Sequence, residues 1–142
     1  MELEWERIVG EVECRLLERK IIIMNSYIVT PEEYELVDFF GVLPNDKNND
    51  GLWNFKVEST NGENLYFSYD IFEKSVQTML MTNEKIKFCV CFDYAEKIEI
   101  ITLANGSKRL CVYFCLPNSL KAELKIEQEE NFFACFWSLL EI

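Results

Sequence analysis

The 142-residue chain contains no histidine. Without imidazole there is no Ser-His-Asp or Cys-His nucleophile system, and no zinc site of the hydrolases that bind metal through histidine. The absence also removes the usual general base near neutral pH. Lysine, carboxylate and tyrosine side chains can still carry protons, but they form no recognisable catalytic motif here. We therefore expect a protein that is not an enzyme and that needs no cofactor.

Glycine and long apolar runs are scarce as well. The five glycines form neither a Gly-x-Gly-x-x-Gly nor a Walker pattern, so no phosphate-binding loop is predicted. The apolar run at residues 21–24 is far shorter than the ~20 residues of a membrane helix. The acidic start, Met1-Glu-Leu-Glu-Trp-Glu6, lacks the basic region of a signal peptide. We expect a cytoplasmic protein whose six cysteines stay reduced.

Positive charge is also in short supply. The chain has 14 basic and 25 acidic residues, a net charge of −11. Residues 1–71 hold six basic and 15 acidic residues, against eight and ten in residues 72–142. Such a field repels nucleic acid and anionic membranes and attracts basic proteins. A surplus of acid also keeps a protein soluble, and composition alone leaves that simpler interpretation open.

The length and the 49% hydrophobic content predict one packed domain over residues 1–142. Apolar residues at helical spacing predict a helix over residues 2–19, although a strand at 10–16 remains an alternative. Thr30-Pro31-Glu32-Glu33 predicts a second helix, with Thr30 as its cap and Glu33 closing a capping box. This helix is expected to stop near Gly41.

After the polar loop at residues 44–51 the apolar period changes from helical to two. Asn61-Gly62 and Asn105-Gly106 predict hairpins with type I′ turns. Residues 131–140 fit a strand or a helix, and their aromatic residues favour a strand. The predicted fold class is α+β, an antiparallel β-meander sheet of six or seven strands packed with two N-terminal helices. The predicted strands are 52–59, 64–69, 75–82, 85–93, 96–103, 108–116 and 121–127.

Two groups of residues bear on metal binding. The pairs Cys89/Cys91 and Cys111/Cys115 lie in apolar runs, where buried reduced thiols are expected rather than a four-sulfur metal site. Residues 46–51 match the first half of a calcium loop, but Val57 stands where the bidentate glutamate belongs. We expect no bound metal, with calcium at 46–51 kept as the alternative.

Trp53 follows the acidic loop at the start of a predicted strand, where its ring can stay half exposed. Negative charge steers a basic partner, and an exposed ring adds contact area that is desolvated on binding. The predicted partner-binding residues come from the second helix and the loop after it: Glu32, Glu33, Glu35, Asp38, Asp46, Asp50 and Trp53.

The segment Leu65-Tyr-Phe-Ser-Tyr-Asp-Ile-Phe-Glu-Lys-Ser-Val76 combines a strand with a turn that carries Ser-Val. It leads through Lys85-Ile-Lys-Phe88 to the meander strand at Ile98-Glu-Ile100. This order resembles the small immunity proteins of bacterial polymorphic toxin systems, which include contact-dependent inhibition systems. The histidine that some of these families carry near the N-terminus is absent, and no residue role is carried over. The resemblance implies a cytoplasmic protein that blocks a cognate toxin, often a basic nuclease, by covering its active site.

Three functions are therefore to be compared. The first is an acidic, non-catalytic binding protein, an immunity protein that neutralises a basic toxin by electrostatically steered occlusion. The second is a structural or assembly subunit that forms a homo-oligomer through strand edges or the apolar tail, which its size in solution tests. The third is a small carboxylate-based enzyme or ligand-binding domain, which requires a deep pocket with a carboxylate of raised pKa.

Overall fold

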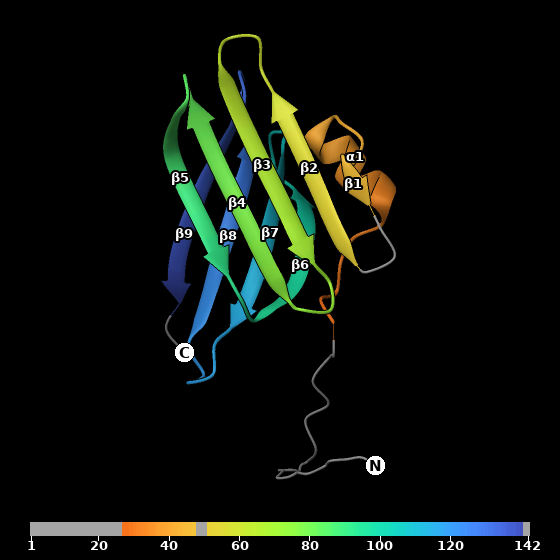
Figure 1. Ribbon diagram of the computed structural model, residues 1–142, viewed down its shortest axis with the longest axis vertical. Coiled ribbons are helices and arrows are strands. Elements are labelled where there is room, and N and C mark those ends of the chain that lie inside the picture. Colours follow the sequence, from red (N-terminus) through yellow and green to blue (C-terminus); the bar gives the residue numbers. More distant parts are fainter. Residues whose placement is uncertain (1–26, 48–50, 141–142) are drawn as a thin grey trace.

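The computed structural model describes residues 27–47 and 51–140, which form two β-sheets packed face to face with a short helix at one side (Figure 1). Within these residues the first sheet has the order β1-β2-β3-β4-β5 and the second the order β6-β7-β8-β9. The first sheet comprises β1 (Asp46–Lys47), β2 (Leu52–Glu58), β3 (Glu63–Asp70), β4 (Ser75–Thr82) and β5 (Lys85–Phe92). The second sheet comprises β6 (Ala95–Thr102), β7 (Lys108–Cys115), β8 (Lys121–Gln128) and β9 (Phe133–Leu140), and the helix is α1 (Glu33–Phe40).

The predicted α+β fold class is therefore wrong, because the described part of the chain is mostly β, with eight main strands in two sheets and one short helix. The strands themselves lie where the sequence predicts them, and residues 133–140 form a strand. A single sheet would leave one apolar face of each strand without cover. Here the chain changes sheet between β5 and β6, so the two apolar faces cover each other. The helix predicted over 2–19 lies outside the described residues.

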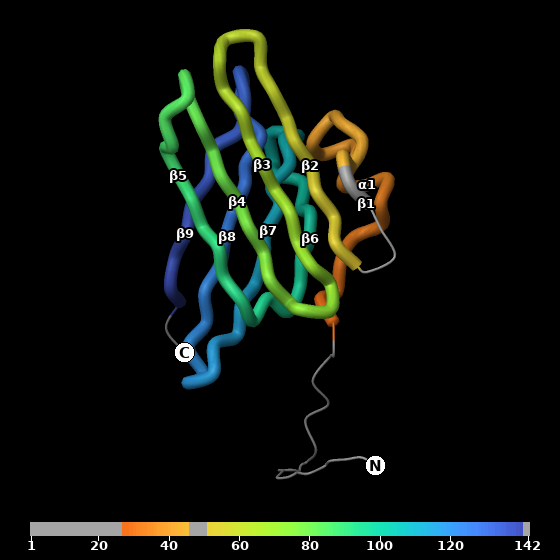
Figure 2. The backbone as a smooth tube through the Cα atoms, in the orientation of Figure 1, coloured from red at the N-terminus to blue at the C-terminus, as the bar shows by residue number. Residues whose placement is uncertain are grey.

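Each sheet is an antiparallel meander, as the path of the backbone in Figure 2 shows. The hairpins at Gly62 and Gly106 occur as predicted, but their turns are not type I′. Each has a three-residue loop in which the glycine alone has a positive φ, 91° and 89°. The two-residue turn with two positive φ values lies instead at Asn83-Glu84. The spacing of the paired strand ends, rather than the Asn-Gly dipeptide, decides the turn type.

The core lies between the sheets. In most of the main strands alternate residues point inward, as the period of two requires, and in β6 a register shift between Ala95 and Lys97 interrupts the alternation. In β3, for example, Leu65, Phe67 and Tyr69 are buried, and in β8 Ala122, Leu124 and Ile126 are buried. Side chains from both sheets and from α1 form one continuous cluster. Burial of these side chains stabilises the sandwich by about 25 cal/mol for each Å² of apolar surface removed from water.

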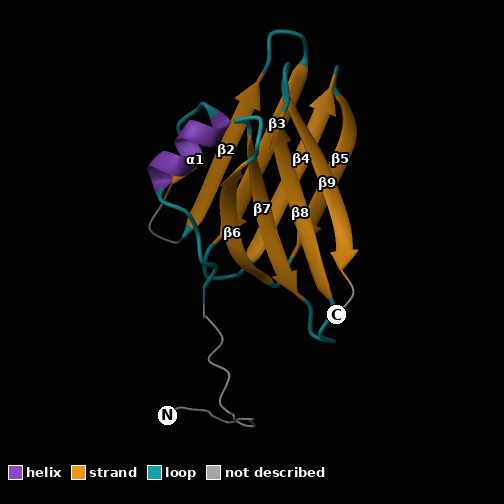
Figure 3. Cartoon of the chain, turned by 180° about the vertical axis from the view of Figure 1, so that it is seen from behind, coloured by secondary structure: helices purple, strands orange, loops and turns teal. Residues whose placement is uncertain are grey.

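Helix α1 closes one open side of the sandwich, next to β2 (Figure 3). Phe40 inserts its ring beside Phe55 and Phe67, with ring centroids 5.0 and 5.4 Å away. Phe39 lies 5.5 Å from Phe133 of the other sheet. The helix therefore contributes two rings to a core that is otherwise made by strands.

Gln128 fastens the end of α1 to the second sheet. Its Nε2 donates to the backbone oxygen of Phe39 at 3.1 Å, and its Oε1 accepts from the backbone N–H of Lys108 at 3.0 Å. The Lys108 ammonium in turn lies 2.7 Å from the Asp38 carboxylate. These contacts satisfy a carbonyl at the helix end that has no partner within the helix.

The cap of α1 differs from the prediction by two residues. Glu32, not Thr30, is the N-cap, and Glu35, not Glu33, closes the capping box by accepting the Glu32 N–H at 2.9 Å. The helix stops at Gly41 as predicted, with φ 76°. The Thr-Pro dipeptide instead lies in the segment that leads into the helix, since Pro31 and Glu32 are both outside it.

Candidate partner-binding surfaces

Of the four predicted helix residues, Glu33, Glu35 and Asp38 lie on α1 and Glu32 is its N-cap, and their carboxylates have different surroundings. Glu32 and Asp38 are exposed, and Asp38 pairs with Lys108 at 2.7 Å. Glu35 is partly buried and holds the helix cap. Glu33 is also partly buried. Burial of Tyr69 raises the pKa of its hydroxyl, and the negative charge of Glu33 raises it further. The carboxylates at α1 that are exposed to a partner are therefore those of Glu32 and Asp38.

Trp53 is half-buried at the start of β2. Its ring stacks on that of Tyr69 with the planes 4° apart and the centroids at 6.1 Å, and it packs against the core. Because Glu33 also acts on Tyr69, the structure brings Trp53 and the start of α1 to the same region. Asp46 belongs to the two-residue strand β1, and its side chain, like all of Asp50, lies outside what the structure describes.

Two exposed apolar side chains beside this acid were not predicted. Tyr34 in α1 is 72% exposed, and Leu43, which follows the helix, is 71% exposed. The helical period contained a signal for Tyr34. With Leu36, Phe39 and Phe40 facing the core, a residue two positions before Leu36 points outward.

A second set of exposed apolar residues gathers at the end of the sandwich where β3 meets β4 and β5 meets β6. Phe72, Tyr27 and Tyr94 are 62%, 48% and 46% exposed, and Val29 is 39% exposed. Sequence analysis missed this set because its members come from three separate segments. We call it the end surface: Tyr27, Val29, Phe72 and Tyr94.

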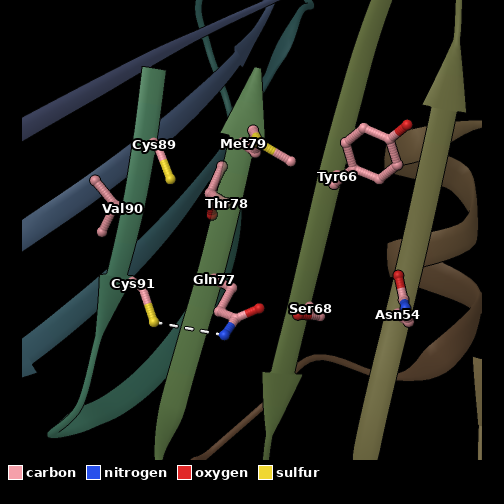
Figure 4. Close-up of a pocket in the computed structure, with 9 residues that line it drawn as sticks. All are labelled: Asn54, Tyr66, Ser68, Gln77, Thr78, Met79, Cys89, Val90 and Cys91. Carbon is pink, nitrogen blue, oxygen red and sulfur yellow. Dashed lines mark hydrogen bonds between the residues drawn. The ribbon is translucent and has the colours of Figure 1, made fainter. Parts of the chain in front are cut away.

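The outer face of the first sheet has a hollow that is lined by uncharged residues (Figure 4). Cys89 and Cys91 are exposed there, and Gln77 Nε2 donates to Cys91 Sγ at 3.5 Å. The prediction that these two thiols are buried is wrong, because the residues of β5 that pack against the core are Phe88 and Phe92. The residues that line the hollow are Asn54, Tyr66, Ser68, Gln77, Thr78, Met79, Cys89, Val90 and Cys91.

The outer face of the second sheet is charged and paired. Arg109 lies 2.7 Å from Glu127, and Lys97 lies 3.0 Å from Glu99. The Tyr113 hydroxyl donates to Glu99 at 2.9 Å. Hydrogen bonds from Lys97 and then from Tyr113 lower the pKa of Glu99. Arg109, Glu127, Lys97 and Glu99 are therefore committed to one another and are not free to pair with a partner.

The described residues offer no metal centre. They contain no group of three or more cysteine, aspartate or glutamate side chains placed to hold an ion. The two cysteine pairs cannot share a metal, because Cys89 and Cys91 lie in β5 of one sheet and Cys111 and Cys115 in β7 of the other. The calcium alternative at 46–51 falls partly outside the described residues. Across 27–47 and 51–140 there is also no helix long and apolar enough to cross a membrane.

Comparison with known proteins finds a similar fold among solved structures but no match in sequence. No protein-family model and no curated protein sequence matches this chain. Among solved structures, it is similar to a chain of the contact-dependent growth inhibition toxin–immunity protein complex from Klebsiella pneumoniae 342. The TM-score is 0.69 at 18% sequence identity, and the match covers 80% of this chain and 97% of that one. The protein therefore shares the fold of a chain found in a toxin–immunity complex.

Proposed function

We propose that this protein is an immunity protein, a non-catalytic inhibitor that binds a basic protein toxin and covers its active site. The observation that carries the proposal is the acidic, exposed surface at α1, where the carboxylates of Glu32 and Asp38 and the 72% exposed ring of Tyr34 all face solvent. The fold shared with a chain of a toxin–immunity complex supports it.

The mechanism follows from charge and burial. A net charge of −11 accelerates the approach of a cationic partner, and the effect falls as salt screens it. After the encounter, an aromatic ring that becomes fully desolvated contributes more binding energy than rim charges do. In this scheme Glu32, Glu33, Glu35, Asp38, Asp46 and Asp50 supply the field, and Tyr34 and Trp53 supply contact area. The cytoplasm, where a toxin would act, is the proposed location.

The experiment uses the product of the neighbouring upstream gene as the probe. Cells that express this product should survive only when the immunity protein is co-expressed, and the two purified proteins should form a one-to-one complex. Glu32→Lys is expected to slow association and to flatten its dependence on salt. Because the Glu32 side chain also caps α1, the unfolding midpoint of the variant is measured alongside to separate the loss of charge from the loss of the cap. Reversal of Asp46 and Asp50 to lysine should act in the same direction.

The matched control is Glu84→Lys. Glu84 is an equally exposed acid in the β4–β5 turn and away from α1, and its substitution changes the net charge by the same amount. If both variants slow association equally, the whole field matters and α1 is not the contact surface. If no complex forms with the neighbouring product and no survival is seen, the immunity proposal is wrong.

A homo-oligomer remains the second candidate because β9 is an edge strand with exposed apolar residues. Phe136 and Leu139 are 45% and 62% exposed, and no residue of Phe133–Leu140 carries a charge. Such an edge can pair with another chain. Sedimentation velocity tests this candidate, since a mass that stays monomeric at all concentrations excludes it.

A further inference from the structure

The exposed side of α1 is too small to be a complete interface. A helix of eight residues is about 12 Å long and about 10 Å wide, a footprint on the order of 100 Å². A stable protein–protein contact buries about 800 Å² on each partner. If α1 contacts a toxin, the contact must continue onto neighbouring surface.

The end surface is that neighbour. Residues 27–32 connect Tyr27 directly to the cap of α1, so the two regions share one segment. On the other side, Phe72 lies against Gly51, where an added Cβ would come within 2.8 Å of its ring. Gly51 precedes β2 and Trp53, which stacks on Tyr69 near Glu33. The end surface and the start of α1 are therefore continuous.

Backbone hydrogen bonds hold the segments of the end surface in place. The N–H of Ile28 donates to the oxygen of Ile71, and the N–H of Val29 donates to the oxygen of Glu96. The N–H of Ala95 donates to the oxygen of Lys74. The exposed rings thus sit on a framework that is already ordered, which reduces the entropy lost on binding.

Two local features fix the backbone that carries the exposed rings of Phe72 and Tyr94. The Asp70 carboxylate accepts from the backbone N–H groups of Phe72 and Glu73, at 3.1 and 3.0 Å, and so fixes the turn that carries Phe72. Tyr94 has a φ of 72°, an uncommon conformation for a bulky residue that costs on the order of 1–3 kcal/mol. The N–H of Cys115 donates to the oxygen of Tyr94 and fixes this residue.

The charge around these rings is negative. Glu73, Asp93 and Glu96 line a hollow together with Tyr94, and Asp70 lies at the turn of Phe72. The nearby ammonium groups are paired, Lys74 with Glu96 at 2.8 Å and Lys97, which forms a β-bridge with Val29, with Glu99 at 3.0 Å. Lys121 lies at the border, on the outer face of the second sheet. Carboxylates beside aromatic faces match arginine, whose guanidinium accepts both ion pairing and stacking.

We propose that the end surface binds an arginine-bearing segment of the toxin and, together with α1, forms one continuous interface. This inference rests on the proposed function and adds to it the aromatic anchors Phe72 and Tyr94 and the chemistry of the segment they receive. The rings stack on guanidinium groups, and Glu73 and Asp93 pair with their charge.

The first test needs no toxin. An octa-arginine peptide is added to the 15N-labelled full-length protein, and the amide shifts are followed by NMR. The largest shifts are expected at residues 27–29, 71–74 and 93–96. Binding by charge alone would shift residues 127–130 equally, because Glu127, Glu129 and Glu130 form another acidic group. Equal or larger shifts at 127–130 would overturn the proposal.

The second test separates rings from charge with matched variants. Phe72→Ser should weaken octa-arginine binding by about tenfold, the effect of one lost anchor. Ile86→Ser removes a side chain of similar exposure, 61%, near the start of β5 and away from the end surface, and should leave the affinity unchanged. Glu73→Lys with Asp93→Lys should also weaken binding by about tenfold, against less than about threefold for Glu84→Lys. Unfolding midpoints show whether each variant is folded. If Phe72→Ser does not fold, the charge variants alone test the proposal.

The third test uses the neighbouring upstream product. If this product binds the wild type, its affinities for the end-surface variants and for Glu32→Lys are measured separately, so that each region is tested on its own. Loss with Glu32→Lys alone overturns the end-surface proposal and leaves the immunity function standing. Absence of any complex removes the immunity function, while selective octa-arginine binding would still support the chemistry of the end surface. If Phe72→Ser instead dissociates a homodimer in sedimentation velocity, the occupant is a second copy and the proposal is wrong.

Discussion

The two open sides of the sandwich are treated in opposite ways. Between β2 and β6 the gap is covered by α1, which inserts Phe39 and Phe40 into the core and presents acid to solvent. On the opposite side, no further helix or strand of the described residues lies beside β5 and β9 (Figure 1), and Leu139 of β9 is 62% exposed. One side is thus built into the core, and the other is left as a pair of free edges.

The free edges are themselves unequal. β5 carries the exposed Lys85 and Lys87, and its pairing with β4 shifts register between Leu80 and Met81 of β4. Both features discourage pairing with another chain. β9 has no charge along its length. The comparison indicates that the α1 side contributes to the stability of the fold, whereas β9 is the edge through which the protein is able to self-associate.

The largest effect is expected on the α1 side. Phe40→Ala should destabilise the protein by about 3–5 kcal/mol, because it removes a buried ring packed between rings of β2 and β3 and leaves a cavity. Urea denaturation followed by fluorescence measures the change. Tyr34→Ala, in the same helix but 72% exposed, is the control and should change stability by less than about 0.5 kcal/mol. Equal effects would mean that α1 does not fill the core.

A smaller effect is expected where α1 is fastened. Gln128→Ala removes hydrogen bonds to Phe39 and Lys108 and should cost about 1–3 kcal/mol, because both backbone groups lose their partner. The same denaturation assay applies. Gln77→Ala, on the outer face of the first sheet, is the matched control and should be nearly neutral. An unchanged stability for Gln128→Ala would show that the helix is held by its phenylalanines alone.

The dependence of stability on alkaline pH tests whether water is excluded from the core side of β9, where Cys135 lies. Burial raises the pKa of the Cys135 thiol from 9.0 to about 12. In the unfolded chain this thiol ionises near its ordinary pKa, so between these values the unfolded chain has lost a proton that the folded chain keeps. The stability is therefore complete below about pH 9 and falls as pH rises above it. The slope from this thiol is at most about 1.4 kcal/mol per pH unit.

The measurement is the unfolding free energy between about pH 8 and pH 10, where model thiols begin to ionise. Cys135→Ala should flatten the fall, whereas Cys91→Ala, which changes an exposed thiol, should keep the wild-type slope. A slope that is identical in all three proteins would mean that Cys135 ionises in the folded state and that the β9 side opens to water.

The smallest effect is expected at the exposed tip of β9. Leu139→Ser should change the free energy of unfolding by less than about 0.5 kcal/mol, since the side chain is already 62% exposed. If wild type self-associates through β9, the same variant should lower that association in sedimentation velocity. A large loss of stability would instead show that the β5/β9 side is covered in solution.

The candidate site was partly predictable. Glu32, Glu33, Glu35 and Asp38 form the cap and the body of one helix, because acid at its start and Gly41 at its end are local signals, although the proline does not mark its first position. Tyr27, Phe72 and Tyr94 could not be grouped from the sequence, because only the packing of three distant segments brings them to one end. The exposure of Cys89 and Cys91 depends on which face of β5 meets the second sheet, a choice that an apolar run leaves open.

By itself, the sequence determined the acidity of the chain, the positions of the main strands and the end of α1. These follow from charge, from the period of two and from turn residues, all of which act over a few neighbouring positions. Only the tertiary structure decided that the strands form two sheets, that Phe40 fills one open side and that the rings of the end surface stay in water. Those outcomes depend on which apolar faces bury one another, and residues far apart in the chain settle that jointly.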